Sequence, residues 1–82
     1  MGMYIVYILK SENYNKTYVG ITNDLQRRLL QHNSGYHSYT KRYKPWFVIY
    51  KDILDNRIEA HIKEKYLKSA AGRRWIKRMF FI

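Results

Sequence analysis

The sequence predicts an α+β fold in which a three-stranded antiparallel sheet is flanked by about three helices. Two short segments rich in β-branched and aromatic residues lie near the N-terminus and are separated by a polar, turn-forming segment. A third such segment follows the one proline, and two longer segments have helical periodicity. A length of 82 residues supports one modest core, so we expect a single domain over residues 1–82.

The first two strands are predicted to form a hairpin. Residues 3–9, MYIVYIL, are apolar on both alternating faces, which is typical of a central strand that is covered on both sides. Residues 10–16, KSENYNK, predict a loop, and residues 17–21 predict the second strand. The pairing would bring Tyr7 close to Tyr18.

A helix is predicted from about residue 24 to residue 33. Asn23 is a good N-cap and Gly35 a good terminator. At 100° per residue, Leu25 and Leu29 form the inward stripe, while Arg28 and His32 lie one turn apart along its edge.

Residues 34–44, SGYHSYTKRYK, lack periodicity and predict a long basic, aromatic loop. Pro45 stops any helix, and residues 46–51 predict a third strand. Within that strand Trp46, Val48 and Tyr50 share one parity.

The C-terminal part is predicted to be helical. A helix from about residue 56 to residue 71 has apolar residues at fourfold spacing, and we expect these to face inward, with Leu67 widening the buried arc. They are Ile58, Ile62, Tyr66 and Ala70. Glu64 falls at the border of this arc. Gly72 is expected to break the helix before a final short helix whose apolar side closes the core. Its apolar residues are Trp75, Ile76, Met79 and Phe80.

The composition favours a folded protein that binds a polyanion. Sixteen Lys and Arg against six Asp and Glu give a net charge of +10, and 46% hydrophobic residues exclude a disordered tail. The lack of cysteine excludes disulfides, thiolate metal sites and thiol nucleophiles. The longest apolar run, residues 4–9, is too short to cross a bilayer, and the N-terminus lacks a signal-peptide pattern. We therefore expect a cytoplasmic protein that binds nucleic acid rather than membrane, with a monomer favoured.

Two tripeptides and the run that follows them resemble the signatures of the GIY-YIG nucleases. Residues 18–20 read Tyr-Val-Gly, a conservative form of Tyr-Ile-Gly, whereas residues 5–7 read Ile-Val-Tyr and retain only the tyrosine of Gly-Ile-Tyr. Residues 22–32 fit the family run Thr-Asn-x-Leu-x-x-Arg-x-x-x-His. Residues 40–45 and 64–75 are also similar to small stand-alone bacterial members, and the chain resembles the N-terminal nuclease domain of the bacterial excinuclease.

The resemblance implies divalent-metal-dependent hydrolysis of DNA, in repair or recombination, with Tyr7, Tyr18, Arg28, His32 and Glu64 around the scissile phosphate. Arg28 suits a phosphate clamp, and Glu64 a ligand for Mg²⁺ or Mn²⁺. Tyr7 is the family's candidate general base, His32 the other credible proton carrier, and Tyr18 would hydrogen-bond the phosphate or the attacking water.

A further set of residues is predicted to hold the nucleic acid, which would be DNA or, as a second candidate, RNA. Aromatic rings could stack on unpaired bases while cations bind phosphates. The set is Tyr39, Lys41, Arg42, Tyr43, Lys44 and Lys68.

Simpler structural roles remain open for the same residues. The tyrosines could be core aromatics whose hydroxyls lie at the rim, Arg28 a solvated helix residue, and Glu64 a partner of Lys68 or His61. Two other functions also remain open: a noncatalytic nucleic-acid-binding domain of the same fold, and a small basic protein that joins a larger repair or ribosomal assembly.

Overall fold

The computed structural model describes residues 3–82 and confirms the predicted α+β architecture. The sheet has the order β2-β1-β3, and β1 is antiparallel to both neighbours. Its strands are β1 (Tyr4–Ser11), β2 (Thr17–Thr22) and β3 (Trp46–Leu54). The helices are α1 (Leu25–Asn33), α2 (Ser38–Lys41), α3 (Arg57–Lys68) and α4 (Ala70–Phe80).

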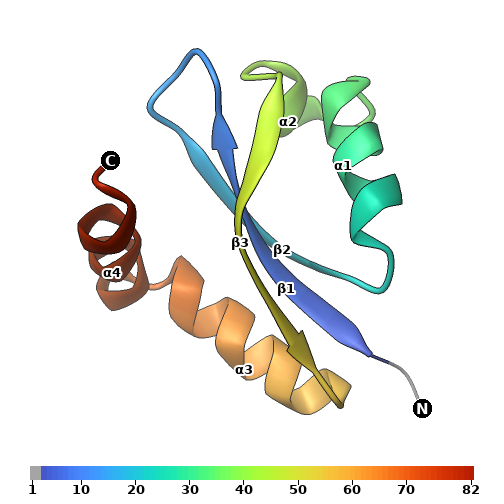
Figure 1. The fold of residues 1–82 in the computed structure, drawn as a ribbon, viewed down its shortest axis with the longest axis vertical. Helices are drawn as coiled ribbons and strands as arrows, with labels where there is room; N and C mark the ends of the chain where they lie inside the picture. The colour runs from blue at the N-terminus through green and yellow to red at the C-terminus, as the bar shows by residue number, and fades with distance from the viewer. Residues whose placement is uncertain (1–2) are drawn as a thin grey trace.

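The sheet is the middle of three layers. Helices α1 and α2 lie on one side of it, and α3 and α4 on the other (Figure 1). The apolar residues of β1 alternate between two separate clusters because successive side chains point to opposite faces. Tyr7 and Leu9 join the cluster under α1, whereas Val6 and Ile8 join the cluster under α3 and α4. The central strand is therefore covered on both sides, as predicted.

A β-bulge in β3 changes which face its side chains serve. Ile8 of β1 is opposite Tyr50, but the next residue, Leu9, is opposite Val48, so Ile49 is an extra residue on β3. Val48 packs in the cluster under α1, whereas Tyr50 packs in the cluster under α3 and α4. Tyr50 therefore faces the opposite side of the sheet from Trp46 and Val48, although the three residues alternate in the sequence.

The loop predicted between α1 and β3 is partly ordered into a helix. Residues 38–41 form the single turn α2, and Thr40 within it is fully buried. Strand β3 also continues past residue 51, because Asp52 and Leu54 remain paired with β1. These two regions are more regular than the sequence pattern predicted.

The predicted inward face of α3 is wrong for Ile58, Ile62, Tyr66 and Ala70, whereas the expected burial of Leu67 is confirmed. Ala60 and Leu67 are the buried residues of this helix, while Ile58 and Ile62 are 74% and 64% exposed. Residues seven apart lie on the same side of a helix, so Ala60 and Leu67 define the side toward the sheet. The small Ala60 allows close contact with the sheet, and the larger Ile58 and Ile62 face solvent on the opposite side.

The break between α3 and α4 lies at Ser69 rather than at Gly72. The Ser69 hydroxyl accepts a hydrogen bond from the Gly72 N–H at 3.1 Å and so caps α4. Gly72 is buried inside α4, where a Cβ would overlap the Tyr66 carbonyl oxygen. Ile76 closes the core as expected, but Met79 is 53% exposed. Along residues 3–82, no helix combines the length and the apolar character required to cross a membrane.

Candidate active site

A pocket of about 380 Å³ lies where β1, β2, α1 and α3 meet. Four of the five predicted catalytic residues line it, namely Tyr7, Tyr18, Arg28 and Glu64. The other lining residues are Tyr4, Gly20, Ile21, Thr22, Asn23, Arg57 and His61. The fifth predicted residue, His32, is fully buried and lies in hydrogen-bond contact with Tyr7.

Gly20 provides the space that the Tyr7 side chain occupies. The two residues are paired across β1 and β2. A Cβ at Gly20 would lie 2.5 Å from Tyr7 Oη and 2.7 Å from Tyr7 Cζ, closer than any ordinary contact. Gly20, the last residue of the Tyr-Val-Gly tripeptide, therefore contributes by having no side chain. This lets the Tyr7 phenol cross the edge of the neighbouring strand and reach the pocket. Ile5 replaces the glycine of the first triplet and packs against the cluster that contains Tyr7.

A chain of hydrogen bonds leads from Tyr7 into the protein. Tyr7 Oη lies 3.1 Å from His32 Nε2, and His32 Nδ1 lies 2.9 Å from Thr40 Oγ1. The Thr40 hydroxyl donates to the carbonyl of His37 at 3.4 Å, so it is free to accept from His32 Nδ1–H. With that tautomer, His32 Nε2 carries a lone pair and accepts the hydrogen of the Tyr7 hydroxyl.

The electrostatics of the pocket favour this assignment. Burial raises the pKa of the Tyr7 phenol well above its usual range, Tyr18 and Glu64 add to the rise, and Arg28 opposes it. Burial, followed by the neighbouring His37 and Arg28, lowers the pKa of His32 to about 4. At neutral pH the pair therefore consists of a protonated phenol and a neutral imidazole.

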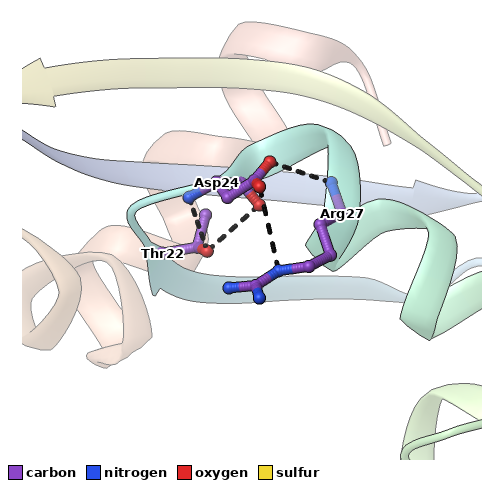
Figure 2. A network of polar contacts seen from close by, with 3 residues as sticks. All are labelled: Thr22, Asp24 and Arg27. Carbon is purple, nitrogen blue, oxygen red and sulfur yellow. Dashed lines mark hydrogen bonds and ion pairs between the residues drawn. The ribbon is translucent and has the colours of Figure 1, made fainter.

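The start of α1 determines which of two adjacent arginines reaches the pocket. Asp24 is the N-cap, and its carboxylate accepts from the Arg27 N–H at 3.1 Å (Figure 2). The Thr22 hydroxyl accepts from the Asp24 N–H at 3.0 Å, and Arg27 Nε lies 3.8 Å from Asp24 Oδ2 (Figure 2). Arg27 thus remains at the exposed cap while Arg28 lines the pocket. The predicted N-cap, Asn23, is wrong by one residue, since Thr22 and Asp24 together form the turn.

Two side chains missed as site residues hold the inner end of the hydrogen-bond chain. Asn33 accepts from the Trp46 N–H at 2.6 Å and donates to the Trp46 carbonyl at 3.1 Å, which fastens α1 to β3. Trp46 Nε1 in turn donates to the Thr40 carbonyl at 2.8 Å. The segment that contains Thr40 is therefore fixed beside His32. Asn33 directly follows His32 and Trp46 begins the predicted third strand, but nothing in the sequence predicts their contacts with each other or with Thr40.

Glu64 lies on the pocket side of α3 with a side chain that is 19% exposed. Lys68 Nζ approaches Glu64 Oε2 at 2.9 Å, and His61 Nδ1 approaches Oε1 at 3.5 Å. Both pairings match the simpler structural role predicted for this residue. Arg57 and His61 were missed by sequence reasoning, although residues 57, 61 and 64 fall on one edge of a helix and could have been grouped.

The donor set of the pocket fits a hard divalent ion only together with a substrate. Among residues 3–82, no three His, Cys, Asp or Glu side chains are grouped as a preformed metal site. Glu64 supplies one carboxylate beside the Tyr7 and Tyr18 hydroxyls, in a pocket with room for water and a phosphate. Mg²⁺ commonly binds one or two carboxylates and takes its other ligands from water and substrate phosphate.

The predicted nucleic-acid-binding residues divide into two places. Five of them lie in or directly after α2: Tyr39, Lys41, Arg42, Tyr43 and Lys44. Lys68 lies apart from them on α3, where it pairs with Glu64. The group near α2 is connected to the pocket by ring contacts, with centroids 5.3 Å apart for Tyr39 and Tyr43 and 6.3 Å apart for Tyr18 and Tyr39.

Residues 3–77 match the family model described as the GIY-YIG catalytic domain. A UPF0213 protein of Clostridium perfringens is 37% identical over 80% of this chain and 71% of its own length. A UPF0213 protein of Staphylococcus haemolyticus is 30% identical over 94% of both chains. The solution NMR structure of a UPF0213 protein from Bacillus halodurans has a TM-score of 0.56 and 26% identity, covering 94% of this chain and 84% of that one. The chain therefore belongs to the GIY-YIG family and is related to the small bacterial UPF0213 proteins.

Proposed function

We propose that this protein is a divalent-metal-dependent endonuclease that hydrolyses phosphodiester bonds in DNA, with RNA as the second candidate substrate. The observation that carries the proposal is the buried Tyr7–His32–Thr40 hydrogen-bond chain, whose outer end opens into a pocket shared with Arg28 and Glu64. A domain that only binds nucleic acid would need the basic surface but not this buried hydrogen-bond chain. Membership of the GIY-YIG catalytic domain family supports the same reading.

Arg28 would bind the scissile phosphate. It lies in the pocket, and none of the ion pairs among residues 3–82 involves it. Its guanidinium can therefore donate to nonbridging phosphate oxygens and stabilise the negative charge that grows on them during attack. Arg57 lines the same pocket from α3 and adds a second positive charge.

Tyr7 and His32 would remove the proton of the attacking water together. The high pKa of Tyr7 disfavours a stable phenolate, so the phenol would accept the water proton while it passes its own proton to His32 Nε2. His32 is neutral and can accept it. A bound phosphate would offset Arg28, one of the charges that lower the pKa of His32, and so would strengthen this base in the complex. Tyr18 would hydrogen-bond the phosphate or the water.

Glu64 is the residue that would hold a Mg²⁺ or Mn²⁺ ion. When bound, such an ion lowers the pKa of its water ligand and stabilises charge on the phosphoryl oxygens. To serve as a ligand, the Glu64 carboxylate must exchange at least part of its pairing with Lys68 and His61. Lys68 would then be available to contact the nucleic-acid backbone.

The test is cleavage of labelled single-stranded, duplex and branched DNA, and of RNA, with Mg²⁺, with Mn²⁺ and with EDTA. We expect metal-dependent cleavage whose rate falls about 100-fold or more in Arg28→Ala, because one phosphate-stabilising group is lost. Glu64→Gln should also lose cleavage, since the amide is a poor ligand for a hard cation.

Matched controls are available on the same helices. Arg27→Ala removes the same charge from α1 outside the pocket, and Glu59→Gln makes the same change as Glu64→Gln at an exposed position on α3. Both should retain the wild-type rate within about twofold. Tight nucleic-acid binding without cleavage in any metal would overturn the proposal in favour of the noncatalytic binding domain. Equal cleavage by Arg28→Ala and Arg27→Ala would remove the assigned site.

A further inference from the structure

Four tyrosines form a continuous series of ring contacts that leads away from the pocket. Starting at Tyr18 in the pocket wall, Tyr39 is 6.3 Å away, Tyr43 is 5.3 Å from Tyr39, and Tyr14 is 5.3 Å from Tyr43, measured between ring centroids. These residues come from β2, from the α2 segment and from the hairpin loop between β1 and β2. We call this series the aromatic track.

The loops that carry the aromatic track are fastened to each other. The buried Ser11 donates its hydroxyl hydrogen to the Tyr43 carbonyl at 2.6 Å and accepts from the Tyr14 N–H at 3.2 Å. Lys10 Nζ donates to the Tyr14 carbonyl at 2.8 Å, and the Glu12 N–H donates to the Pro45 carbonyl at 3.0 Å. The outer rings are therefore held in position before any ligand arrives.

The aromatic track is open to solvent and lined with positive charge. Tyr14 is 50% exposed and Tyr39 is 46% exposed. Lys16 Nζ and Arg42 Cζ lie 5.3 Å and 5.7 Å from the centroid of the Tyr43 ring. Residues 34–44 contain no acidic residue.

Exposed aromatic rings between cations are the chemistry that binds an unpaired nucleic-acid strand. The faces of its bases are available for stacking, whereas those in a duplex are already stacked on one another. We propose that the aromatic track binds a single-stranded segment of the substrate, stacking its bases on Tyr39 and Tyr14 and leading its backbone to the phosphate held at Arg28. This inference rests on the proposed nuclease function, because it specifies the substrate class of the same pocket.

The experiment measures binding without cleavage. Fluorescence anisotropy in EDTA compares a labelled oligothymidine with a duplex of equal length and with a strand of equal length that lacks its central bases but keeps every phosphate. We expect the intact strand to bind about 100-fold more tightly than the baseless strand, because the baseless strand loses the stacking contacts on both rings. Tyr14→Ala and Tyr39→Ala should each weaken binding of the intact strand about tenfold and leave the baseless strand nearly unchanged.

Matched variants separate stacking from folding. Tyr14→Phe and Tyr39→Phe keep the ring and should bind as the wild type does. Tyr66→Ala removes a ring of similar exposure, 47%, from the far side of α3 and should also have no effect. Equal affinity for the intact and baseless strands, or unchanged binding by both alanine variants, would overturn the inference.

The two proposals can fail separately. If the protein cleaves with Mg²⁺ but binds the intact and the baseless strand equally well, the proposed nuclease function holds and the inference about the aromatic track fails. A base-dependent preference in EDTA that disappears in Tyr39→Ala, together with no cleavage in any metal, would support the aromatic track as the surface of a single-strand-binding domain.

Discussion

The Tyr7–Gly20 pair shows how one missing side chain can position a functional group. The Tyr7 ring is almost completely buried, yet its hydroxyl reaches both His32 and the pocket because it crosses the backbone of the edge strand at a glycine. This contact gives the second triplet a structural meaning that is independent of any catalytic role. The same side chain serves as a core aromatic and as a candidate reactive group.

Gly20→Ala should therefore both destabilise the fold and stop cleavage. Its Cβ would overlap the Tyr7 phenol, and overpacking of this kind costs about 1–3 kcal/mol. Denaturant unfolding of Gly20→Ala, Tyr7→Ala and the double variant would measure the coupling. The penalty of the alanine should be largely absent when Tyr7 is truncated. Additive losses would show that the two residues do not interfere.

His32 gives the stability a specific pH dependence. Its pKa is lowered from 6.5 to about 4 in the folded protein, so below pH 6.5 the unfolded chain binds a proton that the folded chain rejects. The free energy of unfolding should fall by about 3 kcal/mol between these two pH values and level off below the lower one. Above pH 6.5 the contribution of this residue is constant.

Urea unfolding at a series of pH values checks this titration. His32→Gln should flatten the decline relative to the wild type, whereas His61→Gln, which changes a largely exposed histidine, should leave its shape intact. The same slope in His32→Gln and the wild type would show that another group causes the acid sensitivity.

At the scale of the element, α3 shows that an apolar stripe need not be the buried one. Ile58, Ile62 and Tyr66 repeat every fourth residue, yet the sheet contacts the side that contains Ala60, Glu64 and Leu67. This orientation brings a carboxylate to the pocket, which the more apolar face could not do. It also allows Lys63 to reach Asp52 at 3.5 Å.

Two substitutions on α3 distinguish these faces. Leu67→Ala should lower the free energy of unfolding by about 2–5 kcal/mol, because it leaves a cavity in the core. Ile62→Ala, which truncates a side chain that is 64% exposed, should change it by no more than about 0.5 kcal/mol. Chemical denaturation of both variants gives the answer, and a larger loss for Ile62→Ala would mean that the apolar stripe is the buried one after all.

At the scale of the whole molecule, local patterns were sufficient for the architecture and for two pairs of candidate site residues, Tyr7 with Tyr18 and Arg28 with His32. Alternation in residues 3–9 and 17–21 identified the hairpin, and its pairing brought Tyr7 toward Tyr18. One turn of helix between Arg28 and His32 placed both on the same side of α1. The location of these residues around one pocket followed from the resemblance of the motifs to a known family.

The features that were missed depend on contacts between distant segments. Whether Ala60 or Ile62 faces the sheet is decided by how closely the helix can approach, and a small residue gives little signal in a hydrophobic pattern. Gly72 has the usual signature of a helix end, but its function is to let α4 pack against the end of α3. The bond between His32 and Thr40 joins residues eight apart across a loop, where helical spacing offers no guidance.

Because of the bulge at Ile49, the layer that each side chain of β3 joins depends on the number of residues in the strand as well as on their polarity. On one side of Ile49, Trp46 and Val48 belong to the α1 layer, and on the other side Tyr50 and Leu54 belong to the α3 layer. A strand of the same sequence without the bulge would assign its second half to the wrong layer, whereas deletion of Ile49 would make Val48 and Tyr50 ordinary alternating neighbours and leave both halves in their layers. Ile49 therefore acts as a phase shift in the strand, because this one extra residue lets apolar side chains of the same parity pack in opposite layers.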